Sequence, residues 1–175
     1  MKNTLKKIMG LTTLAILAVA ISASHHAYGQ QSSKGETSDQ LITSGKGARA
    51  LEGSWSAVVT FRVCATGDAI RSFPSMATYM QGGTMQEFGV GAAPLPRGPG
   101  HGKWDYVGDG DFTSAFQFFR FNADGSYAGY SVAHRQMQMN ADATSYTATS
   151  AVSIYNPAGV QVGSGCGTEV ATRFE

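Results

Sequence analysis

Charged residues are scarce in this sequence, and their scarcity limits the partners it can have. Only 14% of the 175 residues are charged, and the formal net charge is +1. A nucleic-acid-binding domain shows a basic stripe or a high isoelectric point, so the composition argues against nucleic acid as a partner. The length leaves room for one domain after a leader, and the hydrophobic content of 42% is enough for one packed core.

Motifs for metal, phosphate and acyl-transfer chemistry are also missing. The sequence has no Gly-x-Ser-x-Gly motif and no phosphate-binding loop. Beyond the first 29 residues the histidines are His101 and His134, too few for a metal site if the two cysteines pair with each other. The Asp109-Gly110-Asp111 segment lacks the length and spacing of a calcium loop. We therefore predict neither a metal nor a cofactor.

The first 29 residues have the features of a secretory signal peptide. A positively charged start precedes an apolar run over residues 8–23, and the small residues of Ala27-Tyr28-Gly29 form a cleavage site that leaves Gln30 as the mature N-terminus. An uncleaved membrane anchor is the alternative, but the run is shorter than the ~20 residues of a spanning helix. We predict export to a periplasm or out of the cell, with no stable membrane span after cleavage.

The two cysteines, Cys64 and Cys166, both lie beyond the leader. The leader therefore has no thiol for a lipid anchor, and we predict that the protein is not a lipoprotein. In an oxidising compartment an even number of cysteines indicates a disulfide, and two allow a single intramolecular pairing. Two buried free thiols are the alternative, which export makes less favourable.

The composition and the hydrophobic pattern of the remaining chain change near residue 49. Residues 30–48 are polar and rich in Ser, Gly and Lys, which predicts a mobile arm. Residues 49–175 consist of short alternating segments divided by turn residues, which predicts a β domain with no helical period. The expected strands are 52–64, 76–81, 84–88, 102–107, 112–122, 126–140, 145–155 and 160–174. Gly82-Gly83 is a two-residue hairpin signal.

Serial hairpins of this number predict a single antiparallel up-and-down barrel of about eight strands, although a sandwich shares much of the pattern. If Cys64 and Cys166 face each other across the first and last strands, the antiparallel register places Arg173 opposite Ala57. Arg173 then lies diagonal to Trp55 on the same face, within reach of a long side chain. Such pairing would also remove both edges of the sheet.

At these residues the sequence resembles the calycin superfamily, the lipocalin-type barrels. Gly53-Ser54-Trp55 is similar to the family's Gly-x-Trp at the start of the first strand, and Arg173 is similar to the arginine that packs over that tryptophan. The chain also resembles a group of secreted bacterial barrels that share Gly82-Gly83-Thr84 and the Gly-His-Gly-x-Trp motif at 100–104. The resemblance implies structural roles for Trp55 and Arg173, and it brings no established activity.

Two residues are candidates for acid–base chemistry. His101 has a side chain whose unperturbed pKa is near neutrality, and Glu169 has inward parity in the register above. They would form an acid–base pair if they met. The alternative for the motif is a turn in which Gly100 and Gly102 supply unusual backbone angles, His101 bonds a carbonyl and Trp104 plugs the core.

Several long side chains in strand interiors are candidates for binding a ligand. Arg135 shares a face with methionines and would anchor an anionic headgroup in an apolar pocket, and Arg120 invites the same hypothesis. In the alternative interpretation, both side chains extend along the apolar surface and place their charged ends at the barrel rim. The predicted lining is completed by other apolar side chains: Met76, Met80, Met137 and Trp104. Filling of a narrow barrel is the alternative use for the methionines.

Three functions remain open at this point. The leading hypothesis is an exported barrel that binds a small, largely apolar molecule. The second is a cofactor-independent cyclase or isomerase resembling allene oxide cyclase barrels, which act largely by holding a substrate conformation. The third is a structural or interaction protein with a filled core. A cavity of a few hundred Å³ would favour the first two over the third, whereas the sequence gives no oligomeric state.

Overall fold

Alternation of buried and exposed residues generates the strands of this protein. The computed structural model describes residues 47–90 and 97–174, and the segments predicted as signal peptide and, for the most part, as polar arm lie outside them. The strands are β1 (Gly53–Arg62), β2 (Ala69–Tyr79), β3 (Thr84–Gly89), β4 (Gly100–Gly108), β5 (Asp111–Phe121), β6 (Tyr127–Met139), β7 (Ser145–Tyr155) and β8 (Gln161–Arg173). In β6 the inward positions from Gly129 to Met139 are all buried.

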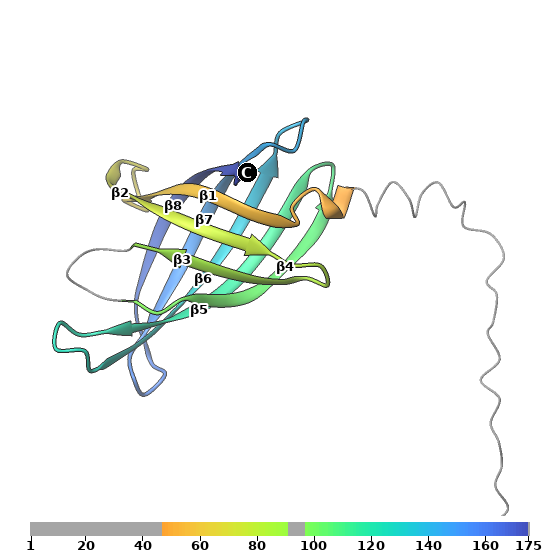
Figure 1. The fold of residues 1–175 in the computed structure, drawn as a ribbon. Helices are drawn as coiled ribbons and strands as arrows, with labels where there is room; N and C mark the ends of the chain where they lie inside the picture. The colour runs from red at the N-terminus through yellow and green to blue at the C-terminus, as the bar shows by residue number, and fades with distance from the viewer. Residues whose placement is uncertain (1–46, 91–96, 175) are drawn as a thin grey trace, which may run out of the picture. The chain divides into compact units, whose positions relative to one another are not determined.

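Each strand pairs antiparallel with the next, and β1 pairs with β8, so the sheet closes into an up-and-down barrel. Figure 1 shows β8 lying beside β1. The predicted fold class is therefore confirmed. The strand boundaries differ most for β2, which begins at Ala69 instead of Met76. The turn at Gly82-Gly83 is also longer than predicted, because Met80 to Gly83 separate β2 from β3.

Cys64 and Cys166 form the predicted disulfide, with their Cα atoms 5.2 Å apart. The predicted register is wrong by two residues, because Cys64 lies beyond the end of β1 and Cys166 is opposite Arg62. Arg173 consequently lies directly opposite Trp55 instead of Ala57. Its guanidinium carbon is 4.4 Å from the centre of a Trp55 ring. The structural roles expected for this pair therefore hold in a different register.

The end of the barrel near Trp55 is filled with apolar side chains. Residues at the start of β1, β5 and β7 and at the end of β2, β4 and β6 form the core there; it includes Trp55, Tyr79, Trp104, Phe112, Met137, Met139 and Tyr146. A short helical turn at residues 47–50 packs against this end, since a Cβ on Gly47 would approach the Tyr106 hydroxyl within 2.6 Å. Residues 47 and 48 thus belong to the barrel and not to the arm.

Arg173 joins this helical turn to the barrel. Its guanidinium donates hydrogen bonds to the carbonyls of Ala50 at 2.6 Å, Glu52 at 2.9 Å and Ala143 at 3.2 Å. The indole Nε1 of Trp55 donates to the Leu51 carbonyl at 2.9 Å. These bonds satisfy backbone groups that the turn leaves unpaired, and they hold one end of the barrel shut.

Replacing both cysteines by alanine should lower the free energy of unfolding by about 4 kcal/mol. The disulfide spans 102 residues, and closing a loop of that length in the unfolded chain is worth about 4 to 5 kcal/mol. Urea unfolding of the Cys64→Ala, Cys166→Ala protein measures the loss. A reductant should bring the parent protein to the same stability and leave the variant unchanged. A loss below about 1 kcal/mol would contradict the prediction.

Candidate ligand-binding site

The opposite end of the barrel contains a cavity of about 530 Å³. Its wall is formed by aromatic, aliphatic and basic side chains: Phe61, Arg71, Phe73, Arg97, Phe118, Arg120, Phe121, Tyr127, Val152 and Ile154, with Asn122, Ala128, Ser131 and Pro157. Most of these residues come from the ends of β1, β5 and β7 and from the first halves of β2 and β6, whereas Arg97, Asn122 and Pro157 lie in the connections between strands. The interior is therefore filled at one end and hollow at the other.

Three arginines and no acidic residue of the described chain line this cavity. The guanidinium of Arg71 stacks over Phe61 and Phe73, with its carbon 5.1 Å and 5.6 Å from the two ring centres. Arg120 donates to the carbonyls of Ala128 at 3.1 Å and Tyr155 at 3.5 Å. Its Nε has no hydrogen-bond partner among the described residues. The cavity wall thus carries positive charge beside apolar surface.

Arg97 differs from the other two because it has a carboxylate partner. Its guanidinium pairs with Glu87, which is fully buried, and stacks over Phe118 at 3.9 Å from the ring centre. Arg97 and Arg120 are paired across an isolated β-bridge. Like charges directly opposite each other are destabilising, and Glu87 offsets that repulsion by neutralising Arg97.

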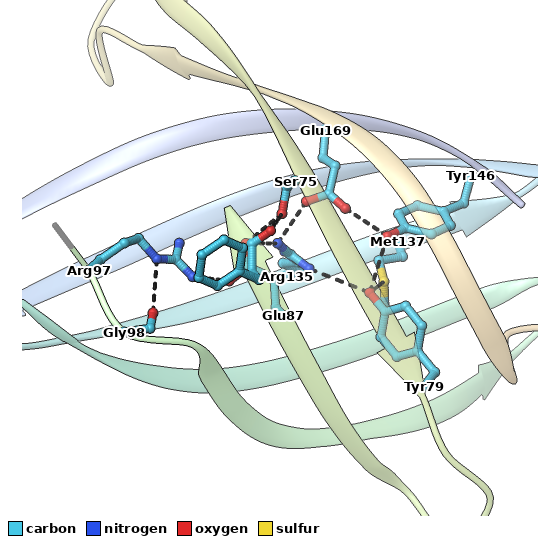
Figure 2. Close-up of polar contacts among 10 residues, drawn as sticks. Ser75, Tyr79, Glu87, Arg97, Gly98, Arg135, Met137, Tyr146 and Glu169 are labelled. Carbon is cyan, nitrogen blue, oxygen red and sulfur yellow. Dashed lines mark hydrogen bonds and ion pairs between the residues drawn. The ribbon is translucent and has the colours of Figure 1, made fainter. Parts of the chain in front are cut away.

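A buried layer of charged side chains lies between the cavity and the filled end (Figure 2). Arg135 is central to it: one of its terminal nitrogens lies 2.8 Å from a Glu169 oxygen and 4.0 Å from a Glu87 oxygen. The Ser75 hydroxyl donates to Glu87 at 2.6 Å, and the Tyr146 hydroxyl donates to Glu169 at 2.6 Å. With Arg97 the layer contains two cations and two anions, so its net charge is zero.

The environment of this layer changes the pKa values of its members. Burial alone would lower the pKa of Arg135, but the charge of Glu169, with smaller contributions from its other neighbours, raises it above its ordinary value. Burial is the main cause of the raised pKa of Tyr146, and Tyr79 and Glu169 add to it. The pKa of Tyr79 is also raised, again chiefly by burial. Both phenols therefore stay protonated at neutral pH.

A small second cavity connects the charged layer to the wall of the main cavity. Its volume is about 40 Å³, and Glu87, Arg135 and Glu169 are among the residues that line it. Phe73, Arg97 and Phe118 contribute to the walls of both cavities. This space is far below the range of ligand pockets. The charged layer thus forms the floor beneath the main cavity.

Glycines in β4 make room for this interior. A Cβ at Gly102 would meet the Ala115 carbonyl oxygen at 2.0 Å, and one at Gly100 would meet the Phe116 ring at 2.6 Å. The Gly-His-Gly-x-Trp motif therefore lies in a strand and allows β5 to approach, so the alternative of a turn is wrong. Trp104 is 5% exposed and its Nε1 donates to the Met80 carbonyl at 3.0 Å, as expected for a core plug.

The two candidates for acid–base chemistry do not meet. His101 is exposed on the outer surface of β4, whereas Glu169 is 3% exposed inside the barrel. The prediction of an acid–base pair is therefore corrected. The inward parity expected for Glu169 is correct, but Gly100, Gly102 and Trp104 take the inward positions of β4 and leave His101 outside.

The ligand-binding candidates divide into three groups. Arg120 lines the cavity. Arg135 and Met137 are buried below it, where Arg135 faces carboxylates and Met137 accepts a hydrogen bond from Tyr79 at 3.4 Å. Met76 and Met80 are 50% and 36% exposed and are not among the cavity's lining residues. Their assignment to the lining is therefore wrong, and Trp104 likewise belongs to the filled end.

Sequence reasoning missed Arg71, Arg97, Glu87 and Tyr146. Arg71 was overlooked because β2 was expected to begin at Met76, after a segment interrupted by Pro74. Arg97 lies in a Gly- and Pro-rich stretch. Glu87 and Tyr146 alternate with exposed residues along β3 and β7, so their inward parity was visible. Their interaction was not, because it depends on which strands face each other.

Among residues 47–90 and 97–174, no group of three or more His, Cys, Asp or Glu side chains lies where a metal ion would bind. No helix in the same part of the chain is long and apolar enough to cross a membrane.

Replacing Arg135 by methionine should lower the free energy of unfolding by about 3 to 5 kcal/mol, because the substitution leaves a buried carboxylate without its partner. Urea unfolding at pH 7 measures the effect. The matched control is Lys103→Met on the outer surface, where the lysine side chain is 74% exposed; it should change stability by about 0.5 kcal/mol or less. Equal effects of the two substitutions would contradict a stabilising charged layer.

Stability should fall above pH 10 more steeply in the parent protein than in Tyr146→Phe. The pKa of a phenol in the unfolded chain is about 10. At a pH between this value and the raised pKa of the folded state, the unfolded chain binds fewer protons than the folded protein. The free energy of unfolding then decreases by up to about 1.4 kcal/mol per pH unit for each such phenol. Urea unfolding from pH 8 to pH 11 measures the slope. Parallel slopes in the two proteins would contradict the raised pKa of Tyr146.

Comparison with known proteins leaves the site to be interpreted from its own geometry. No family model and no curated protein matches this chain. The resemblance to calycins consequently stays a prediction that rests on the residues quoted for it, Gly53-Ser54-Trp55 and Arg173 above all. What these side chains do in the structure is close the filled end of the barrel, opposite the cavity.

Proposed function

We propose that this protein is an exported barrel that binds a small, largely apolar molecule in the cavity at its open end. The observation that carries the proposal is the cavity of about 530 Å³ with phenylalanine and branched aliphatic walls. Pockets for small molecules have volumes of roughly 300 to 1,000 Å³ and mostly apolar linings. A barrel that served only as a scaffold would gain stability by filling this space with its own side chains.

Export is part of the same proposal. The leader lies outside the described residues, but the Cys64–Cys166 disulfide is a feature that persists in oxidising compartments. An apolar molecule is poorly soluble in such an aqueous space, so a closed barrel that shields it would be useful there.

The second candidate is a cofactor-independent isomerase or cyclase, and one observation favours it. Glu169 and Arg135 line a small cavity that shares walls with the main one, so ionisable groups lie close beneath the bound molecule. Binding is nevertheless the better supported function, because these groups already neutralise each other and bond to tyrosines. A general base needs to be within hydrogen-bond reach of its substrate, and neither Glu169 nor Arg135 is among the residues that line the main cavity.

Enlarging a side chain in the cavity should abolish binding of an apolar probe. Nile red, an uncharged dye that fluoresces in apolar surroundings, is titrated with the mature protein. In Val152→Trp the indole would occupy part of the cavity, and the affinity should fall by about tenfold or more, which is about 1.4 kcal/mol.

The control is the same substitution on the outer surface. Val170 is 58% exposed on β8, so Val170→Trp should bind the dye as the parent does. Thermal unfolding of both variants establishes that each is folded. Saturable binding that is equal in all three proteins would place the dye elsewhere, and absence of binding to the parent would argue against a pocket for apolar molecules.

A further inference from the structure

We infer that the cavity selects an amphipathic anion, held with its anionic group at the open end by Arg71 and Arg120 and with its apolar body directed inward. This inference rests on the proposed function and specifies its ligand class. It also assigns the anionic group to residues other than Arg135, the deeper arginine.

The first argument is the imbalance of charge on the cavity wall. Of its three arginines, Arg97 is neutralised by Glu87, whereas Arg71 and Arg120 have no carboxylate within ion-pair distance in the described chain. A guanidinium stays charged at any physiological pH. The guanidinium of Arg71 is stacked over phenylalanine rings, and Arg120 has a buried Nε without a hydrogen-bond partner in the described chain. Both groups lose part of their hydration without gaining a counter-charge, and an anionic ligand would supply it.

The second argument is the order of side chains along the strands. Along β2, Arg71 is one inward position nearer the open end than Phe73, and along β5, Arg120 is one inward position beyond Phe118. The two arginines therefore form an outer level and the phenylalanines an inner level. A molecule that satisfies both levels has a charged end toward solvent and an apolar end toward the floor.

The third argument excludes the opposite orientation. Arg135 lies within the floor, is 4% exposed at its side chain, and contacts Glu169 at 2.8 Å. Its guanidinium also stacks over Phe116 at 4.5 Å from the ring centre and donates to the Tyr79 hydroxyl at 3.4 Å. An anion brought to this point would have to displace a buried carboxylate, which costs several kcal/mol.

The test compares ligands of equal carbon number that differ in the headgroup, an anionic carboxylate or a neutral hydroxyl. Decanoate and decanol have the same chain, and each is made to compete with Nile red for the mature protein at pH 8. We expect decanoate to bind at least about tenfold more tightly, since a hydrogen bond to a charged group contributes about that factor or more. Acetate, which has the charge without the apolar body, should not displace the dye.

Variants then assign the preference to the two arginines. Arg71→Gln and Arg120→Gln lie on different strands, and each should lose most of the preference for decanoate while its affinity for decanol stays within about twofold of the parent value. Lys103→Gln removes one positive charge from the outer surface, where Lys103 is exposed, and should keep the preference. Because decanol binding is measured in every variant, a loss of folding is distinguished from a loss of charge recognition.

Three outcomes would overturn the inference. Equal affinities of the parent for decanoate and decanol would refute it and leave the proposed function standing. A preference that survives in both arginine variants would place the anion elsewhere. Failure of both ligands and of Nile red to bind would remove the proposed function together with this inference.

Discussion

The pairing of β1 with β8 is the constraint on which the rest of this structure depends. It converts a serial meander into a closed barrel, because each of the other strand pairs joins neighbours along the chain. Closure leaves no free edge and creates an interior in which β2, β5, β6 and β7 face each other. The disulfide adjoins one end of this pairing and the stack of Arg173 on Trp55 lies at the other. Both therefore stabilise the same contact.

The interior is organised in levels along the barrel axis. Aromatic side chains fill the level next to the helical turn, a neutral set of two arginines and two glutamates occupies the middle, and the outer level is hollow. A buried ion pair is not by itself a strong source of stability, because desolvation offsets its attraction. Its effect here is positional: the charged layer separates a packed core from a cavity, and Glu87 holds the guanidinium of Arg97 inward.

This separation explains why the two halves of the barrel suit different roles. The filled half gains stability from dense packing and from the bonds of Arg173, so it can support a half that leaves apolar surface unfilled. The hollow half combines phenylalanine walls with guanidinium groups, and among the described residues one of them, Arg120, is bonded only to carbonyl oxygens. Apolar walls provide affinity, and a few polar groups provide orientation.

The sequence alone determined most of the strand pattern and most of the turns, because these depend on local signals. It also indicated the pairing of the cysteines, because it contains two of them. The gaps between the strands predicted over 112–174 are turns in the structure, with Gly125 and Gly159 in the left-handed conformation at φ 82° and 78°. A period of two residues separates the faces of a strand, and it correctly placed Arg135 on the same face as Met137. It carries no information on which residues of distant strands become neighbours.

Those neighbours were decided by the tertiary structure. A stagger of two residues between β1 and β8 preserves every face and yet moves Arg173 from Ala57 to Trp55, so no pattern within one strand could fix it. The same holds for the site: Arg71 and Arg120 are 49 positions apart in the sequence and come to one cavity only because closure brings β2 across from β5. The local sequence determines which face of a strand each side chain occupies. The stagger of the strands around the whole closed sheet determines which side chains line the cavity.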